Sequence, residues 1–288
     1  MLCLLWLLPA VASAETSHPL PMWLADGERN RVYLLGSVHL LRATDHPLPR
    51  TMETAYEDAE ALVMELDMDD VDPLAVQTTT NRLGLLHDGR TLADVLGQAR
   101  YREAEAAARA LELPFELLAK TEPWFAAVTI EQLILLRIGF NPTYGIEMHM
   151  AAQAARDGKS IAGLETVEEQ LAVLDGLSPE AQGALLLQAL SEGSNAPAYM
   201  DRMIDAWRHG DSAFFETLLR EEFRPNRELY EAIVVRRNRA WVDDIAVLLD
   251  DEIDYLVIVG ALHLVGEDGL PRLLAEQGIA TRQLHEPL

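Results

Sequence analysis

Short apolar runs, separated by longer helical stretches, dominate the pattern of hydrophobic and polar positions along the chain. The runs are rich in Val, Ile and Leu, and they occupy residues 32–35, 61–66, 160–164, 255–259 and 279–284. Several are apolar at consecutive positions, which is typical of strands that are covered on both faces. The pattern predicts an α/β fold with a central, mostly parallel sheet flanked by helices.

The segment between the first two predicted strands has helical periodicity. Its apolar residues recur at the spacing of one helix face, namely Met52, Ala55, Tyr56 and Ala59. A helix between two parallel strands makes a β-α-β unit, whose crossover is expected to be right-handed.

The middle of the chain is mostly helical. Residues 92–111 are Ala-rich and amphipathic, and residues 123–140 are apolar on nearly every side. Glu131 and Arg137 interrupt this second stretch, which favours a buried helix over a membrane span.

The predicted strands and helices form one continuous arrangement without a low-complexity linker. The strands lie towards the two ends of the chain and near residue 160, and helices fill the sequence between them. We therefore expect a single domain over residues 15–288, with helical insertions at about 71–143 and 178–249.

The composition limits the possible partners. The chain has 288 residues, 49% of them hydrophobic, which is enough for a substantial core. Asp and Glu number 47 against 23 Lys and Arg, giving a formal net charge of −24. Such a chain is repelled by phosphate backbones and anionic lipid surfaces, so we expect no nucleic-acid partner.

The N-terminal stretch is typical of a secretory signal. An uncharged apolar segment is followed by small residues at Ala12 and Ala14, which predicts a signal peptide over residues 1–14 and cleavage before Glu15. A buried or interfacial N-terminal segment is the alternative. Cleavage would remove the single cysteine, Cys3, leaving no thiol for disulfides, zinc ligation or nucleophilic catalysis. We expect a periplasmic or secreted protein that has no membrane attachment after cleavage.

Two copies of Gly-x-x-His are the strongest functional signal. Gly36 and His39 follow the first predicted strand, and Gly260 and His263 follow the fourth. In an open α/β sheet, ligands bind beyond the carboxyl ends of the strands, so both histidines should lie there. Each glycine would allow a tight turn after its strand and keep side-chain bulk away from the site.

Acidic residues occupy matching places on other predicted strands. Glu65 and Asp67 end one run, and Glu165 ends another. Two imidazoles and a carboxylate with open coordination positions are a common catalytic site for zinc, manganese or iron. The alternative is a purely structural role, in which both histidines are hydrogen-bonded in the fold and Glu65 is a helix cap or a salt-bridge partner. His149 is the one further histidine that we retain as a candidate.

Other well-known motifs are missing from the sequence. It has no G-x-S-x-G nucleophile elbow, no phosphate-binding G-x-x-x-x-G-K-[ST], no G-x-G-x-x-G and no C-x-x-C-H. The functional hypothesis therefore rests on the paired Gly-x-x-His motifs.

The whole pattern resembles the TraB/GumN family, which includes the Tiki proteins. The resemblance runs from YLLGSVHLL to VGALHLVGEDGL, with YGIEMHM, GKSIAGLETVEEQLAVLD and RRNRAWVDDI as intermediate blocks. It implies an α/β fold of the erythromycin-esterase and ChaN type. For Tiki-like members it also implies metal-dependent proteolysis, with manganese or cobalt favoured and zinc an alternative.

The resemblance also implies particular site residues. The motif positions are Gly36, His39, Glu65, Gly260 and His263, and the other blocks contain Glu147, Glu165, Arg237 and Asn238. His39, Glu65 and His263 would hold the metal. Glu165 or Glu147 would act as general base or support the ligands. Arg237 could hold a substrate carboxylate or an oxyanion, or form a salt bridge to a core acid.

These observations lead to one main hypothesis and two alternatives. The main hypothesis is a metal-dependent hydrolase that acts on a peptide or small-molecule substrate. The first alternative is a haem- or metal-binding protein that uses the same histidines, and the second is a non-catalytic accessory factor of a surface-polysaccharide system.

Overall fold

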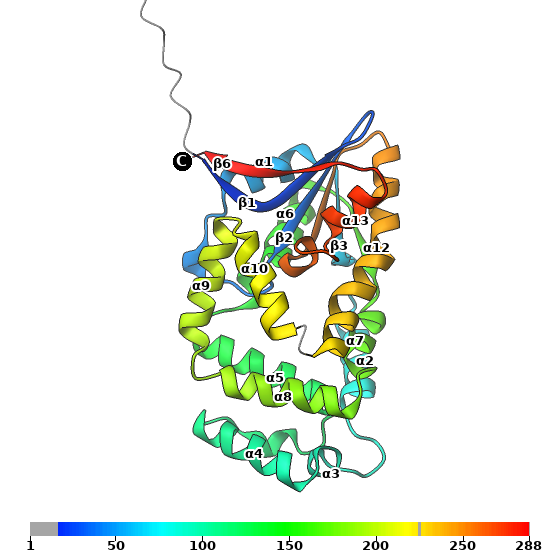
Figure 1. Cartoon of the computed structure of the whole chain (residues 1–288). Helices are drawn as coiled ribbons and strands as arrows, with labels where there is room; N and C mark the ends of the chain where they lie inside the picture. Colours follow the sequence, from blue (N-terminus) through cyan, green and yellow to red (C-terminus); the bar gives the residue numbers. More distant parts are fainter. Residues whose placement is uncertain (1–16, 224–225, 288) are drawn as a thin grey trace, which may run out of the picture.

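A six-stranded mixed sheet forms the centre of the molecule (Figure 1). The computed structural model describes residues 17–223 and 226–287, so the predicted signal peptide lies outside the described residues. The strand order is β4-β3-β5-β2-β1-β6. The strands are β1 (Ser17–Asp26), β2 (Arg31–Ser37), β3 (Ala61–Leu66), β4 (Ile161–Glu165), β5 (Tyr255–Gly260) and β6 (Thr281–Pro287).

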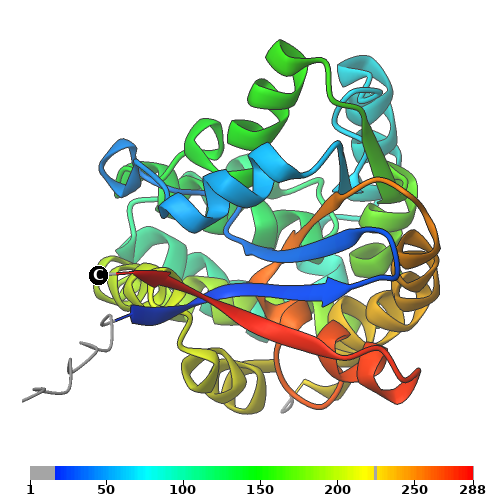
Figure 2. The same ribbon diagram turned by 90° about the horizontal axis from the view of Figure 1, so that it is seen from above.

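The prediction of a mostly parallel sheet is confirmed. β2, β3, β4 and β5 pair in parallel, and β1 runs antiparallel to both of its neighbours. Figure 2 shows β1 and β6 side by side along one edge region of the sheet. The sequence pattern missed β1, because Pro19 and Pro21 interrupt its apolar run and prolines argue against a strand. An irregularity in the β1–β6 register between Pro19 and Trp23 accommodates them.

Helices cover both faces of the sheet, which explains the continuous apolar runs. In β5, Leu256 and Ile258 join the cluster with α1 (Arg50–Asp58) and α6 (Ile146–Asp157). The intervening Val257 and Val259 join the cluster on the opposite face. That face is covered by α12 (Arg236–Val247) and α13 (Leu270–Glu276). Alternate residues of one strand therefore pack against different helical layers.

A separate helical layer lies opposite the carboxyl ends of the parallel strands (Figure 1). It is built mainly from α5 (Pro123–Arg137) and α8 (Pro179–Glu192), with α3 (Leu92–Leu96) and α4 (Gln98–Ala110) beyond them. These helices share their own apolar cluster, a second packing centre to which both expected insertions contribute, because α3, α4 and α5 lie in the first and α8 lies in the second. Among the described residues, no helix is both long and apolar enough to cross a membrane.

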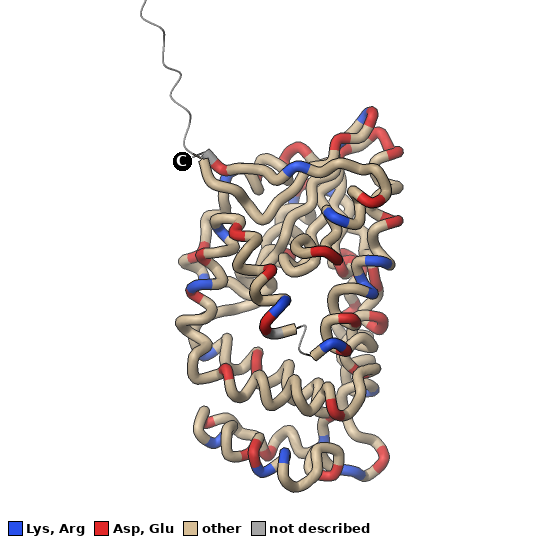
Figure 3. Tube along the Cα trace, viewed as in Figure 1, with Lys and Arg blue, Asp and Glu red and all other residues tan. Residues whose placement is uncertain are grey.

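The remaining helices connect these layers. They are α2 (Pro73–Gly84), α7 (Val167–Asp175), α9 (Ala196–Arg208), α10 (Ser212–Leu218) and α11 (Arg227–Tyr230). Two π-helical turns, Leu219–Phe223 and Glu231–Val235, adjoin α10 and α12. Acidic positions are spread over the sheet region and the helical layer alike (Figure 3).

Candidate functional site

The two Gly-x-x-His motifs lie at the ends of adjacent parallel strands. β2 pairs with β5 so that Gly36 lies beside Val259, and Ser37 lies beside Gly260. The motifs are therefore offset by a single residue across the sheet. β3 flanks β5 on its other side and ends in the same direction, which places Glu65 beside both motifs. The sequence repeat thus has a spatial reason, because neighbouring parallel strands deliver their residues to one edge of the sheet.

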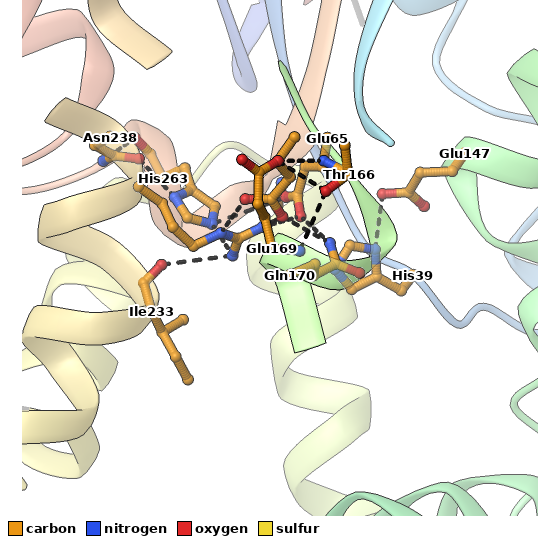
Figure 4. A network of polar contacts seen from close by, with 12 residues as sticks. His39, Glu65, Glu147, Thr166, Glu169, Gln170, Ile233, Asn238 and His263 are labelled. Carbon is orange, nitrogen blue, oxygen red and sulfur yellow. Dashed lines mark hydrogen bonds and ion pairs between the residues drawn. The ribbon is translucent and has the colours of Figure 1, made fainter. Parts of the chain in front are cut away.

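Three predicted site residues surround Gly260. A Cβ atom built on Gly260 would lie 3.4 Å from Glu65 Oε1, 3.5 Å from the His263 ring and 3.8 Å from His39 Nε2. The Gly260 amide also donates a hydrogen bond of 2.7 Å to Glu65 Oε1. The structure therefore brings His39, Glu65 and His263 together, as the sequence predicted, and leaves room between them only because residue 260 has no side chain (Figure 4).

Arg237 of α12 forms the centre of the charged cluster. Its Nη2 atom lies 2.5 Å from Glu65 Oε2 and 2.6 Å from Glu165 Oε1, and its Nε atom lies 3.1 Å from Glu165 Oε2. Gln170 of α7 donates to both carboxylates, at 3.2 Å to Glu65 and 3.0 Å to Glu165. The side chains of Arg237 and both glutamates are nearly buried, so these groups depend on one another for charge compensation.

The electrostatic environment shifts the pKa values of Glu65 and Glu165 in opposite directions. Burial alone would raise the pKa of Glu65, but attraction by His263, Arg237 and His39 outweighs burial and lowers the pKa to about 2. Burial raises the pKa of Glu165 in spite of the bonded Arg237. Burial opposes the charge of Arg237, yet the two carboxylates raise its pKa overall. The cluster therefore holds one firmly ionised carboxylate beside a permanent cation.

His263 is buried and held as a neutral imidazole. The amide nitrogen of Asn238 donates hydrogen bonds to the backbone oxygens of His263 and Asp268, so its Oδ1 accepts a hydrogen bond from His263 Nδ1–H at 2.6 Å. The remaining nitrogen, Nε2, faces Arg237 Nη1 at 3.1 Å and accepts from it. Burial lowers the pKa of His263 to about 4. Both ring nitrogens are thus engaged within the protein.

His39 has a contrasting environment. Its Nδ1 atom lies 2.8 Å from Glu147 Oε1 of α6, and Ser37 Oγ donates to the same carboxylate oxygen. The attraction of Glu147 raises the pKa of His39 above its ordinary value of 6.5. The His39 side chain is 58% exposed, and no described residue hydrogen-bonds to its Nε2 atom. The family resemblance offered Glu147 as a general base or as a support for the ligands, and the structure makes it the partner of His39.

The sequence analysis missed two residues of the cluster. The first is Gln170. A capping box of Thr166 and Glu169 begins α7 directly after Glu165, and this helix start brings Gln170 against the carboxylates of Glu65 and Glu165 (Figure 4). The Trp241 ring lies 4.5 Å from the Arg237 guanidinium carbon and 4.7 Å from the His263 ring. No short-range sequence signal marks these roles.

His149, the histidine held in reserve, lies outside this cluster. It is on α6, where its Nε2 atom lies 3.2 Å from Glu53 Oε1 of α1 and its ring packs against His46. It therefore connects two helices on one face of the sheet and takes no part in the contacts around Gly260.

The predicted metal ligands fit a divalent cation only in part. His39 Nε2 and Glu65 Oε1 border the space beside Gly260, and both are suitable donor atoms. His263 Nε2 instead faces the Arg237 guanidinium, and a donor directed at a cation is not free for a metal. Within the described residues, no three His, Cys, Asp or Glu side chains are arranged to hold a metal ion.

The fold and the site together define a class of protein: an α/β protein with two Gly-x-x-His motifs at the ends of adjacent parallel strands, with an arginine from α12 bonded beside them. The chain belongs to the TraB/PrgY/gumN family, whose model matches residues 21–283. The resemblance noted from the sequence is therefore confirmed.

Curated relatives include the uncharacterised protein YbaP of Escherichia coli (strain K12) and the protein of the same name in Shigella flexneri. Each is 25% identical over 242 residues, which cover 84% of this chain and 87% of the relative. The similarity thus extends over nearly the full length of both proteins. No solved structure matches this chain significantly.

Proposed function

We propose that this protein is a hydrolase that cleaves a peptide or related acyl bond, with His39 as the general base. The observation that supports this most strongly is the geometry of the His39–Glu147 pair. Glu147 orients the imidazole through Nδ1, and the exposed ring leaves Nε2 open towards the space beside Gly260. A carboxylate-bound histidine can remove a proton from water when its ring is neutral. Because Glu147 raises the pKa of His39 to about 9, the neutral form gains as the pH rises, and the hydrolysis rate should increase towards alkaline pH.

Arg237 would supply the electrostatic part of the reaction. Attack of water on a carbonyl places negative charge on the carbonyl oxygen, and a fixed cation stabilises that charge in a site that excludes water. The guanidinium nitrogens already bond Glu65, Glu165 and His263, so Arg237 would act through its fixed charge and not as a new hydrogen-bond donor to the oxyanion. The neutral His263 beside it adds no competing positive charge.

A metal-dependent hydrolase is the second candidate. It is favoured by the approach of His39, Glu65 and His263 to one point beside Gly260. His39 and Glu65 would hold the cation, and His263 could join them if Arg237 turned aside. A bound divalent metal would polarise the substrate carbonyl and lower the pKa of bound water. The resemblance to Tiki proteins supports cleavage of a peptide bond in both candidates, but it supports dependence on a metal only in this one.

A casein assay on the full chain tests the proposal and separates the two candidates. The purified protein should release peptides from fluorescently labelled casein or from a proteome-derived peptide library. The histidine-base mechanism predicts that dialysis against EDTA leaves the rate unchanged and that elemental analysis finds no stoichiometric metal. A loss of ~10-fold or more that Mn²⁺ reverses would favour the metal-dependent candidate. Intact casein and peptides after prolonged incubation would contradict hydrolysis altogether.

The two motif glycines should respond differently to replacement by alanine. Neither has the positive φ that favours glycine, although the chain does turn into a 3-10 helix directly after Gly260, so space is the reason for both glycines. At Gly36 a Cβ would lie 3.0 Å from Ala261 Cα and 3.1 Å from Pro21 O, so Gly36→Ala should cost ~1–3 kcal/mol of stability.

At Gly260 a Cβ would make only ordinary contacts, but with Glu65, His263 and His39. Gly260→Ala should therefore fold with nearly unchanged stability and lose roughly 10-fold or more in hydrolysis rate, because a methyl group would occupy the space between these groups. Urea denaturation and the casein assay measure the two effects separately. Equal stability losses for both variants would contradict this division.

A further inference from the structure

His46 and His149 form a second pair of histidines, apart from the two Gly-x-x-His motifs. His149 lies on α6, and His46 lies in the segment between β2 and α1, directly after the 3-10 helix Ala43–Asp45. Their ring centroids are 5.0 Å apart, and the two rings are inclined by 44°. The proposed mechanism uses neither histidine, so the pair is a separate cluster.

The bonded partners of this pair fix the position of one proton on each ring. His46 Nε2 lies 2.9 Å from the backbone oxygen of Tyr144, and His149 Nε2 lies 3.2 Å from Glu53 Oε1. The hydrogen bond from His149 lowers the pKa of Glu53, so this carboxylate is ionised at neutral pH. A carbonyl oxygen and a carboxylate only accept, so each Nε2 carries a proton. Nδ1 of a neutral ring then keeps its lone pair, and among the described residues none hydrogen-bonds to either Nδ1 atom.

The spacing of the two rings suits shared coordination of a metal ion. With nitrogen–metal bonds of ~2.0–2.1 Å and ligand angles of about 90–110°, two imidazoles on one ion have centroids roughly 4.5–5.2 Å apart. The observed separation of 5.0 Å falls within this range. Metal-bound histidines usually donate the other ring N–H to a carboxylate or a backbone carbonyl, and His149 and His46 have these two kinds of partner.

Gln153 adds an unsatisfied acceptor beside the pair. It lies one helical turn after His149 on α6, and its Nε2 atom donates to Glu53 Oε2 at 3.1 Å. Because the carboxylate only accepts, the amide nitrogen must face Glu53. The Oε1 atom of Gln153 is then buried without a hydrogen-bond partner among the described residues. A buried acceptor without a donor is costly, and a water molecule bound to a metal ion would supply one.

We propose that His46 and His149 bind a divalent transition-metal ion through their Nδ1 atoms. Imidazole nitrogens suit Zn²⁺, Ni²⁺ and Cu²⁺, whereas Mg²⁺ and Ca²⁺ require oxygen ligands. Among the described residues no third His, Cys, Asp or Glu completes a ligand set, so water would occupy the remaining positions. With only two protein ligands the ion should dissociate on dialysis, so the purified chain should be metal-free, as the histidine-base mechanism also expects.

The ion would join the two segments that carry the His39–Glu147 pair. His39 and His46 both lie between β2 and α1, whereas Glu147 and His149 both lie on α6. An ion held by His46 and His149 would therefore fix these two segments to each other. It would also stabilise the folded chain, because the unfolded chain does not hold the two rings together. This inference does not depend on hydrolysis or on any metal beside Gly260.

Binding of Zn²⁺ to the full chain tests the site. In NMR spectra of the wild-type protein, ZnCl₂ should shift the imidazole nitrogen resonances of His46 and His149, and MgCl₂ should shift neither. Calorimetry in a His39→Asn background, which removes a candidate ligand beside Gly260, should show saturation at about one ion per chain. In that background the Zn²⁺ affinity should fall ~10-fold or more with His46→Asn or His149→Asn.

His87→Asn in the same background is the matched control. His87 is an exposed histidine that bonds to the backbone oxygen of Asn81, so its replacement should leave the Zn²⁺ affinity unchanged. Excess ZnCl₂ should raise the melting temperature of this control but not of the His46 and His149 variants. Equal affinity in all variants would overturn the inference. Wild-type resonance shifts confined to other histidines would overturn it as well, even if a variant failed to fold.

Discussion

Replacing Arg237 with methionine is expected to destabilise the protein by ~3–5 kcal/mol, the usual cost of breaking a buried ion pair from one side. Methionine approximates the length of the arginine stem and removes only the charged end. Glu65 and Glu165 would then share a buried position with no cation, at side-chain exposures of 8% and 7%. Gln170 alone cannot neutralise two carboxylates.

The destabilisation should depend on pH. Without Arg237, burial and mutual repulsion raise the folded-state pKa of Glu65 and Glu165 above their unfolded values. The penalty is then complete at neutral pH, and it diminishes as the pH falls and the buried carboxyl groups become protonated. Adding Glu65→Gln and Glu165→Gln to Arg237→Met should restore stability at neutral pH for the same reason.

Urea denaturation at pH 7.5 and pH 5 measures this effect. Arg239→Met is the matched control, because Arg239 lies two residues away on the same helix with 67% side-chain exposure and only a 3.8 Å pair with Asp268. It should change stability by less than ~1 kcal/mol. A loss of similar size in both variants would mean that the charged cluster contributes nothing specific.

Replacing His39 with asparagine should lower the hydrolysis rate by ~10²–10⁴-fold, the range expected when a general base is removed. Stability should change little, because the side chain is 58% exposed and its one bonded partner, Glu147, retains Ser37 as a donor. The fold and the other residues around Gly260 should remain in place.

The His39 variant is compared with His87→Asn in the casein assay and in thermal melting. His87 is an exposed histidine that hydrogen-bonds only to the backbone oxygen of Asn81 among the described residues, so its replacement should leave the rate unchanged. The hydrolysis rate of Glu147→Gln should lie between those of wild type and His39→Asn, because an amide oxygen can still orient the imidazole without attracting its charged form. Full activity in His39→Asn would exclude His39 as the general base and leave Glu65 as the next candidate for that role.

The sequence by itself determined the sheet positions that matter for the site. Apolar runs predicted β2, β3, β4 and β5. Nearly every residue of β2, β3 and β5 is buried, as expected for parallel strands covered on both faces, whereas β4 lies at the sheet edge and is largely exposed. The rule that ligands gather at the carboxyl ends of such strands then predicted that His39, Glu65 and His263 would meet. The same reasoning identified Glu165 at the end of β4, and the family resemblance added Glu147, Arg237 and Asn238.

Only the tertiary structure decided how the two histidines differ. Their motifs are alike in sequence, but His263 is enclosed by Asn238 and Arg237, whereas His39 is exposed and bonded to Glu147. These partners come from helices more than 20 residues away in the chain, and no local pattern reveals which ring nitrogen each will engage. These contacts determine the protonation state of each histidine and its ability to bind a metal, so the motif alone does not predict either property.

The tertiary structure also decided the reasons for the glycines and the orientation of α5. A missing side chain at Gly260 matters because β3 and β2 bring Glu65 and His39 beside it, and at Gly36 because the chain at Ala261 passes close by. Hydrophobic periodicity predicted a buried helix around Glu131 but not which side would face the sheet. That side was set by packing of the helix against two different clusters, since apolar contacts are non-directional and sequence alone does not assign them to partners.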